Sequence, residues 1–154
     1  MKKKMKILVT GSSGFLGSHL IDFLKKDGYE VVLFDSTPSK YNTDKDTEFV
    51  GDILDSKIVK KALKGCKAVF HFAALADIDD CKNNPYKSIE TNVLGTLVLI
   101  EECLKLNINR FIFSSSMYVY SDRGSFYKTS KIACESLIQE YQKKSSLKPT
   151  ILRF

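Results

Sequence analysis

The sequence predicts an α/β fold: a doubly wound parallel sheet of about six strands with helices on both faces. Two observations predict it. Short apolar runs alternate with segments whose apolar residues recur at helical spacing. Strands that alternate with helices need crossover connections, which favour parallel pairing in a sheet covered on both faces. Because such crossovers are right-handed, we expect the strand order 3-2-1-4-5-6.

The first half of the chain supplies four of these strands. Residues 6–10 form an apolar run that breaks at Gly11, which is typical of a buried parallel strand. Apolar residues then recur at helical spacing from Leu16 to Leu24, and Gly28 is suited to cap this helix at its C-terminus. The other elements predicted here are strands at 30–35, 47–50 and 67–72 and a helix at 56–64.

The second half supplies two long helices and two strands. Pro85 is well placed to start a helix, and apolar residues at helical spacing continue to Leu104, which predicts one long helix. A strand follows at 110–114. The next helix begins near Tyr127, and a last strand is predicted at 150–154.

The composition is that of an ordinary globular domain. The chain has 154 residues, of which 44% are hydrophobic and 27% charged. The net charge of +6 comes from lysines spread along the chain, so a basic nucleic-acid binder is disfavoured. No apolar run approaches the roughly 18 residues of a membrane span. We therefore expect a protein that binds neither nucleic acid nor a membrane.

The residue types that bind metals are scattered. The four cysteines form no CxxC pair, and the two histidines complete no zinc spacing. We expect no metal site, and reduced thiols in a cytoplasmic protein. His71, at a strand end, is expected to be a packed core residue, and the acidic run 77–80 a solvated loop rather than a cation site.

A glycine-rich loop, TGSSGFLGSHL, follows the first strand and opens the first helix. Gly11, Gly14 and Gly17 stand three apart. Glycine lets the backbone turn sharply and lets a pyrophosphate approach main-chain N–H groups at the helix N-terminus. A tight turn that happens to be glycine-rich is the alternative. A P-loop is excluded because no Gly-Lys-Ser/Thr follows.

An acidic residue stands where a nucleotide-binding loop needs one. Asp35 ends the second strand, 18 residues after Gly17. A carboxylate there can accept the ribose hydroxyls of adenosine and would repel a 2′-phosphate, which favours NAD over NADP. Aspartates also end strands as turn formers. The glycine loop, the helix after it and an aspartate at this distance along the chain together favour cofactor binding. Asp52 either bonds the adenine amino group or caps the following helix.

Further motifs complete a family pattern. HFAA (71–74) ends the fourth strand, TNVLGT (91–96) lies in the long helix, and FSSSMYVY (113–120) and YKTSK (127–131) follow. With the glycine loop, these resemble the extended branch of the short-chain dehydrogenase/reductase superfamily, the NAD-dependent nucleotide-sugar epimerases, dehydratases and reductases. The resemblance covers nearly the whole chain and implies a Rossmann fold. Two departures are Ser121, where the family has a glycine, and the short segment between Ser116 and Tyr127.

The resemblance implies specific site residues. The catalytic residues would be Ser116, Tyr127 and Lys131. Backbone amides of the glycine loop would bind phosphate, and Asn92 would support the cleft from behind. The cofactor-binding residues would be Gly11, Gly14, Phe15, Leu16, Gly17, Asp35, Ser36, Asp52, Ile53, Phe72, Ala73, Ala74, Asn92, Ser114, Tyr127 and Lys131.

A chemical role for the tyrosine follows from its neighbours. Tyr127 and Lys131 stand four apart and can converge from one helix face. A free tyrosine has a pKa of about 10, and we expect the Lys131 ammonium to lower it. Tyr127 would take a proton from a sugar hydroxyl while hydride passes to the nicotinamide, with Ser116 bonding the reacting oxygen. The alternative is a structural role without catalysis, with Tyr127 packed and Lys131 solvated.

The favoured function is NAD-dependent epimerase or dehydratase chemistry on a UDP-, GDP- or dTDP-sugar. Two alternatives stay open: a non-catalytic dinucleotide-binding sensor, and a short-chain reductase of a small carbonyl compound. Residues 1–154 would be the NAD-binding domain, and the family's C-terminal substrate domain is absent from this chain. The chain would then be a fragment of a larger enzyme, or its substrate site would come from elsewhere. The resemblance also implies a homodimer through helices near 85–106 and 127–144.

Overall fold

The computed structural model describes residues 4–40, 43 and 46–154. Its strands are β1 (Lys6–Thr10), β2 (Glu30–Asp35), β3 (Thr47–Val50), β4 (Ala68–His71), β5 (Arg110–Ser115) and β6 (Lys148–Arg153). Its α-helices are α1 (Phe15–Lys26), α2 (Ser56–Leu63), α3 (Ile78–Asn83), α4 (Pro85–Ile89), α5 (Gly95–Lys105) and α6 (Ser125–Lys144). A π-helix, Glu90–Leu94, joins α4 to α5, and a 3-10 helix, Met117–Tyr120, follows β5.

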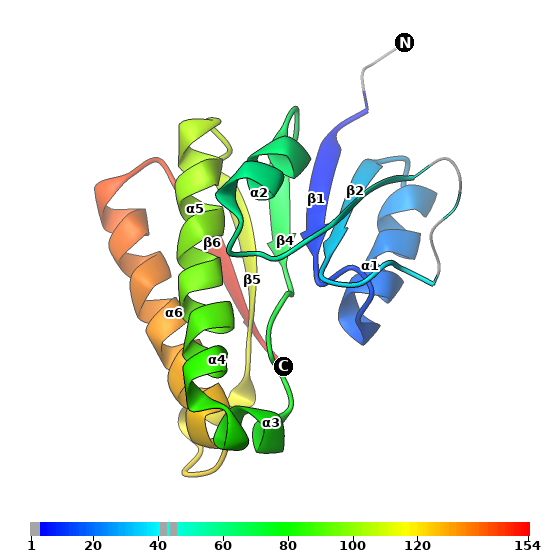
Figure 1. Ribbon diagram of the computed structural model, residues 1–154. Coiled ribbons are helices and arrows are strands. Elements are labelled where there is room, and N and C mark those ends of the chain that lie inside the picture. The colour runs from blue at the N-terminus through cyan, green and yellow to red at the C-terminus, as the bar shows by residue number, and fades with distance from the viewer. Residues whose placement is uncertain (1–3, 41–42, 44–45) are drawn as a thin grey trace.

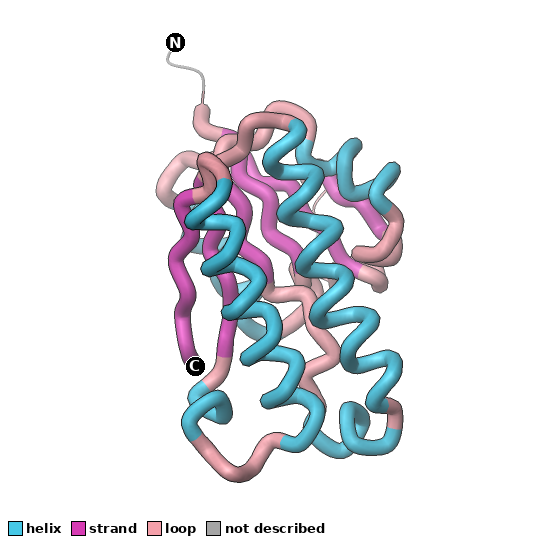
Figure 2. Tube along the Cα trace, turned by 90° about the vertical axis from the view of Figure 1, so that its left-hand side faces the viewer, coloured by secondary structure: helices cyan, strands magenta, loops and turns pink. Residues whose placement is uncertain are grey.

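The strands form one parallel sheet in the order β3-β2-β1-β4-β5-β6. Helices α5 and α6 lie against one face of this sheet, and α1 lies against the other (Figure 1). The turned view shows α5 and α6 running side by side in front of the strands (Figure 2). The predicted doubly wound α/β fold and its strand order are confirmed.

Alternate residues of each central strand pack on opposite faces of the sheet. On β1, Leu8 joins the larger core with α2, α5 and α6, whereas its neighbours Ile7 and Val9 join the smaller core under α1. All three side chains are buried. Because both faces are covered here, β1 reads as a continuous apolar run rather than an alternating one.

Two predicted elements need correction. The single helix expected from Pro85 is divided by the π-helix, because the buried Asn92 bonds to groups outside the helix, as described below. The acidic run expected to be a loop contains α3, because the Asp77 side chain caps its first turn by accepting hydrogen bonds from the N–H groups of Asp79 and Asp80.

The last strand also begins earlier than predicted. It starts at Lys148, whose N–H donates to the carbonyl of Asn109 at 2.7 Å. Pro149 has no N–H to give to a ladder, but β6 is an edge strand and tolerates it. The result is a strand paired with β5 along its whole length, up to Ser115 and Arg153.

Candidate functional site

A cleft of about 650 Å³ lies at the carboxyl ends of the strands, where the strand order reverses between β1 and β4. Ligands of doubly wound sheets bind at this place. Asn92 and Ser116 are the predicted site residues that do not line the cleft. The predicted residues that line it are Gly11, Gly14, Phe15, Leu16, Gly17, Asp35, Ser36, Asp52, Ile53, Phe72, Ala73, Ala74, Ser114, Tyr127 and Lys131.

Glycine is required at two points of the loop after β1. Gly11 has a φ of +69°, and a Cβ added there would lie 2.7 Å from the backbone N of Ala73. A Cβ added at Gly17 would lie 2.1 Å from the carbonyl oxygen of Gly11. The loop therefore packs backbone against backbone, both on itself and on the segment after β4. The first residues of α1 line the cleft, so the N-terminus of this helix lies where a pyrophosphate would bind.

The Asp35 carboxylate joins the glycine loop to the end of β2. Its Oδ2 accepts from the N–H of Ser13 at 2.9 Å, and its Oδ1 accepts from the N–H of Thr37 at 3.2 Å. Oδ1 also accepts from the hydroxyls of Ser36 and Thr37, each at 3.4 Å, so Oδ2 is the oxygen that keeps a lone pair for a ligand hydroxyl. A negative charge held here opposes a phosphate group at the same position.

Asp52 and Asp55 have separate roles. Asp55 caps α2, since its Oδ1 accepts from the N–H groups of Lys57 and Ile58. Asp52 instead accepts from the N–H of Leu54 at 3.0 Å and lines the cleft. The alternative in which Asp52 caps the helix is therefore wrong.

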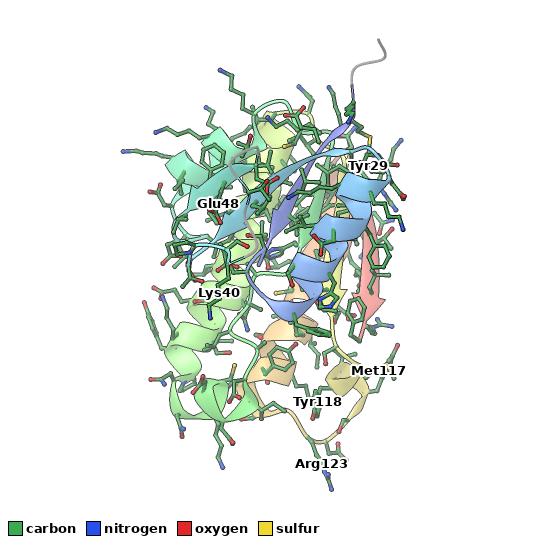
Figure 3. All side chains as sticks on the ribbon, turned by 90° about the vertical axis from the view of Figure 1, so that its right-hand side faces the viewer. Tyr29, Lys40, Glu48, Met117, Tyr118 and Arg123 are labelled. Carbon is green, nitrogen blue, oxygen red and sulfur yellow. The ribbon has the colours of Figure 1, made fainter. Side chains whose placement is uncertain are left out.

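The proposed catalytic residues come from two elements. Tyr127 lies in the first turn of α6, and Lys131 lies one turn further, with 2% of its surface exposed. The Lys131 Nζ donates to the carbonyl of Ser114 at 2.8 Å and lies 5.5 Å from the centre of the Tyr127 ring. Ser116 follows β5, and its Oγ donates to the carbonyl of Phe154 at 3.4 Å. Tyr118, labelled in Figure 3, lies in the 3-10 helix that begins directly after Ser116.

The pKa of Tyr127 differs from the prediction. Burial raises the pKa of its phenol above the ordinary value, and the hydrogen bond with Ser116 offsets this only in part. Burial also lowers the pKa of Lys131 to about 8. The expected lowering of the tyrosine pKa by Lys131 is wrong for this structure, because desolvation of the phenol outweighs the other effects. Lys131 is the member of the pair that titrates near neutral pH.

Asn92 joins three segments behind the cleft. It is 2% exposed; its Oδ1 accepts from the N–H of Leu75 at 2.7 Å, and its Nδ2 donates to the Leu75 carbonyl at 3.0 Å. Nδ2 also donates to the Ser130 hydroxyl at 2.9 Å, and that hydroxyl donates to the carbonyl of Tyr127. Asn92 thus fixes the segment after β4 relative to α6. Every polar atom of its side chain is used in this way.

A buried histidine extends this network to β1. The Thr96 hydroxyl donates to the carbonyl of Asn92, so His71 Nε2 must carry the hydrogen that it shares with Thr96 at 2.9 Å. His71 Nδ1 then accepts from the Thr10 hydroxyl at 2.7 Å, and this hydroxyl accepts from the N–H of Ala73. Burial, aided by the charge of Lys131, lowers the pKa of His71 to about 3. His71 is a neutral core residue, as expected.

Several residues that line the cleft were not predicted. Lys87 on α4 lies outside every motif, and Thr91 on the π-helix opens the TNVLGT motif but was given no role there. The Lys87 Nζ is paired with Glu90 at 3.1 Å. Lys87 has no local signal in the sequence, whereas the motif that contains Thr91 could have indicated it. The others are Ser13, Phe34, Thr37, Gly51, Leu75 and Ala76.

The described part of the chain contains no group of three or more His, Cys, Asp or Glu residues placed to hold a metal ion. Among the described helices, none is both long enough and apolar enough to cross a membrane.

Comparison with known proteins identifies the family. A model of the NAD dependent epimerase/dehydratase family matches residues 7–154. The UDP-glucose 4-epimerase of Haemophilus influenzae is 36% identical, over 97% of this chain and 52% of its own length. That of Erwinia amylovora is 33% identical, over 90% and 49%. The chain spans about half the length of these relatives.

Solved structures have the same fold. The UDP-glucose 4-epimerase of Thermotoga maritima with UDP-glucose superposes with a TM-score of 0.89 at 29% identity, over 97% of this chain and 55% of that one. The Thermus thermophilus UDP-glucose 4-epimerase in complex with NAD gives 0.87 at 30% identity, over 97% and 54%. Since the family model covers nearly all of the sequence, this chain belongs to the NAD-dependent epimerase/dehydratase family.

Proposed function

We propose that this chain is the NAD-binding part of an enzyme that epimerises a UDP-sugar at a ring carbon. One observation carries the proposal: Tyr127 and Lys131 open into the same cleft as the glycine loop and Asp35. A cofactor held by the loop and a sugar held above Tyr127 would therefore meet. The relatives named above are UDP-glucose 4-epimerases, so UDP-glucose is the substrate to test first.

The residues of the cleft fit NAD. Gly11 and Gly17 leave room for a pyrophosphate where any side chain would collide with backbone. Asp35 presents lone pairs to a ribose and a negative charge that opposes the 2′-phosphate of NADP. The Thermus thermophilus relative was solved with NAD. We therefore propose NAD as the cofactor.

The chemistry assigned to the protein is proton transfer. When bound, NAD supplies a hydride acceptor and a positively charged ring. Tyr127 accepts the proton of a sugar hydroxyl and later returns it. Ser116, whose Oγ donates to the Phe154 carbonyl in this structure, would have to turn toward the cleft to bond the reacting oxygen. Because burial raises the pKa of Tyr127, deprotonation of this phenol needs positive charge nearby. Lys131, 5.5 Å from the ring centre, provides a charge that the protein itself holds in place.

The test compares Tyr127→Phe with wild type in the full-length protein that contains this chain. We expect turnover of UDP-glucose to fall at least about 100-fold, because general acid–base catalysis contributes roughly 10²–10⁴-fold, while NAD affinity changes little. Tyr118 lies in the 3-10 helix, and its ring meets that of Tyr127 edge-on. Tyr118→Phe removes a hydroxyl without touching the proposed acid–base group and should keep wild-type turnover. Full activity of Tyr127→Phe would contradict the assigned role. Tight NAD binding without turnover of any nucleotide sugar would favour a non-catalytic sensor.

The proposed enzyme is a homodimer that pairs through α4, α5 and α6. Large apolar side chains are exposed on these elements and the π-helix between them: Tyr86 at 79%, Leu94 at 46% and Ile132 at 41%. Helices α5 and α6 run side by side and could form a four-helix interface with a second copy (Figure 2). Light scattering should report a dimer, and Leu94→Glu with Ile132→Glu should convert it to a monomer.

We also propose a cytoplasmic location. All four cysteines are free and buried, which suits a reducing compartment. Cell fractionation of the full-length protein should recover it in the cytoplasmic fraction, and recovery from an oxidising compartment would contradict this proposal.

A further inference from the structure

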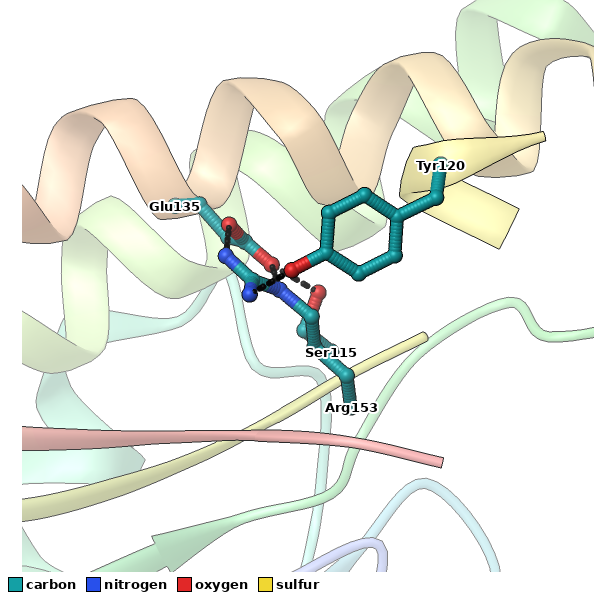
Figure 4. A network of polar contacts seen from close by, with 4 residues as sticks. All are labelled: Ser115, Tyr120, Glu135 and Arg153. Atoms are coloured by element: carbon teal, nitrogen blue, oxygen red, sulfur yellow. Dashed lines mark hydrogen bonds and ion pairs between the residues drawn. The ribbon is translucent and has the colours of Figure 1, made fainter. Parts of the chain in front are cut away.

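An ion pair lies beside the proposed catalytic residues (Figure 4), with the Glu135 carboxylate buried and the Arg153 side chain 34% exposed. Glu135, 8% exposed, is on α6 one turn beyond Lys131 and two turns beyond Tyr127. Its Oε1 accepts from Arg153 Nε at 2.9 Å, and its Oε2 accepts from Arg153 Nη2 at 2.7 Å. Because the guanidinium meets the carboxylate at two points, the pair fixes orientation as well as distance.

The pair also binds the segment that carries Ser116. The Ser115 hydroxyl donates to Glu135 Oε1 at 2.5 Å. Arg153 Nη1 donates to the hydroxyl of Tyr120, and the Arg153 Cζ lies 4.9 Å from the centre of the Tyr120 ring. Figure 4 shows all four side chains converging between α6 and the ends of the two strands. Ser116 therefore lies between two residues that this network holds.

Backbone hydrogen bonds act on the same segment. The N–H of Met117 donates to the carbonyl of Phe154 at 2.7 Å, next to Arg153. These bonds join β6 to the Ser116 segment, whereas Glu135 joins that segment to α6. Lys131 makes a second link from α6, to the carbonyl of Ser114. Two successive turns of α6 thus bond to two successive residues of β5.

Stability alone gives no reason for an ion pair here. Burying the Glu135 carboxylate is unfavourable, and water screens the charge of Arg153, whose side chain is 34% exposed. A well-packed apolar pair of similar volume can therefore be about equally stable. An apolar pair would fill the same space but could not bond the Ser115 and Tyr120 hydroxyls. The Arg153 guanidinium also holds the pKa of Glu135 below its usual range, so the carboxylate stays charged at neutral pH.

We propose that Glu135 and Arg153 are positioning residues that hold Ser116 in register with Tyr127 for proton transfer. This inference rests on the proposed function, since it assigns the network to the same reaction. Neither residue lines the cleft, so both act through Ser115, Tyr120 and the backbone of the Ser116 segment.

The main test is the variant Glu135→Leu/Arg153→Met in the full-length protein. We expect kcat with UDP-glucose to fall at least about tenfold, because small displacements of catalytic groups slow reactions strongly. KM and the Kd for NAD should stay within about threefold, and Tm should not fall by more than a few degrees. Wild-type kcat in this variant would overturn the proposal.

A matched control lies on the same helix. Glu140 pairs with Lys143 at 2.8 Å, but their side chains are 52% and 67% exposed. Glu140→Leu/Lys143→Met makes the same chemical exchange away from Ser116 and should leave kcat unchanged. If Glu135→Leu/Arg153→Met fails to fold, Glu135→Gln keeps the volume and removes the charge, and it too should lower kcat without changing KM. A Glu135→Gln variant with wild-type kcat would overturn the proposal.

A second readout does not depend on turnover. Amide hydrogen exchange in the full-length protein reports how firmly the Ser116 segment is held. In Glu135→Gln, exchange at Met117 and Tyr118 should be at least about tenfold faster, with exchange in β1 and β2 unchanged. Unchanged exchange at Met117 and Tyr118 would overturn the positioning role. Inactivity of the wild-type enzyme on every nucleotide sugar would instead overturn the proposed function.

Discussion

Lys131 and Ser114 are joined directly, with the lysine Nζ 2.8 Å from the serine carbonyl oxygen. The ammonium is buried, 4.9 Å from the centre of the Phe113 ring and 5.5 Å from that of Tyr127. The lysine is therefore anchored to β5 through a backbone atom, and its charge acts on Tyr127 through space. A buried charge held by one carbonyl is costly for the fold, and this cost can be measured.

Lys131→Met should stabilise the protein and inactivate it. The pKa of Lys131, lowered from 10.5 to about 8, corresponds to roughly 3 kcal/mol, from which the lost hydrogen bond subtracts about 1 kcal/mol. Below pH 8 the lysine is charged in both the folded and the unfolded chain, so the full free-energy cost of burying the ammonium is present. We expect the free energy of unfolding at pH 7 to rise by about 2 kcal/mol.

The increase in the free energy of unfolding of Lys131→Met should shrink as the pH rises from 8 to 10.5. In this range the wild-type lysine is charged in the unfolded chain and neutral in the folded one, so its burial costs less. Urea unfolding at pH 7 and pH 9.5 measures the difference. Lys128→Met, on the same helix, serves as the control and should show no comparable gain. A Lys131→Met protein that is less stable than wild type at pH 7 would contradict the prediction.

His71 should make the fold sensitive to mild acid. Its pKa falls from 6.5 to about 3 on folding, so its contribution is present above pH 6.5 and is lost as the pH falls toward 3. Between pH 6.5 and 5 the loss is about 2 kcal/mol. His71→Gln should remove this slope from urea unfolding measured across that range. His19→Gln, an exposed change in α1, should keep it.

Gly17→Ala should disrupt the nucleotide loop. The added Cβ would lie 2.1 Å from the carbonyl oxygen of Gly11, and a backbone atom cannot move away as a side chain could. We expect the free energy of unfolding to fall by about 3 kcal/mol and NAD affinity to fall at least tenfold. Gly28→Ala is the control: with φ at +85° and nothing within 4 Å, it should cost about 1 kcal/mol and leave NAD affinity unchanged.

Asp35→Asn should weaken the preference for NAD over NADP. The change keeps the size of the side chain and removes the charge that opposes a 2′-phosphate. We expect the Kd for NADP divided by the Kd for NAD, both measured by calorimetry, to fall at least tenfold. Asp55→Asn, at the start of α2 and outside the cleft, should leave the ratio unchanged. An unaltered ratio in Asp35→Asn would mean that another group selects the cofactor.

The strand order could be predicted because right-handed crossovers leave few arrangements for alternating strands and helices. The start of α3 also had a signal, an aspartate followed by acidic residues in the first turn, typical of a capped helix. The π-helix had no local signal in the sequence, since it depends on the hydrogen bonds that Asn92 makes with Leu75 and Ser130.

The cleft was predictable where its residues follow a motif. Glu135 and Arg153 stand 18 residues apart on different elements, and no local pattern relates them. The prediction that Lys131 lowers the pKa of Tyr127 was wrong for a similar reason. Spacing along a helix shows that Lys131 is near, but the depth of burial that opposes ionisation depends on the whole fold.

The π-helix makes the chain intolerant of a change in length at one place. Each residue of an α-helix turns the chain by about 100°, and a π-turn holds one residue more than an α-turn. Loss of a single residue between Glu90 and Leu94 would convert this turn to an α-turn, so α4 and α5 would keep the faces that they present to the sheet. The residues of the widened turn would move instead: Thr91 would lose its place in the cleft and Asn92 its bonds to Leu75. A one-residue deletion here would leave the sheet intact and release the segment after β4 from α6.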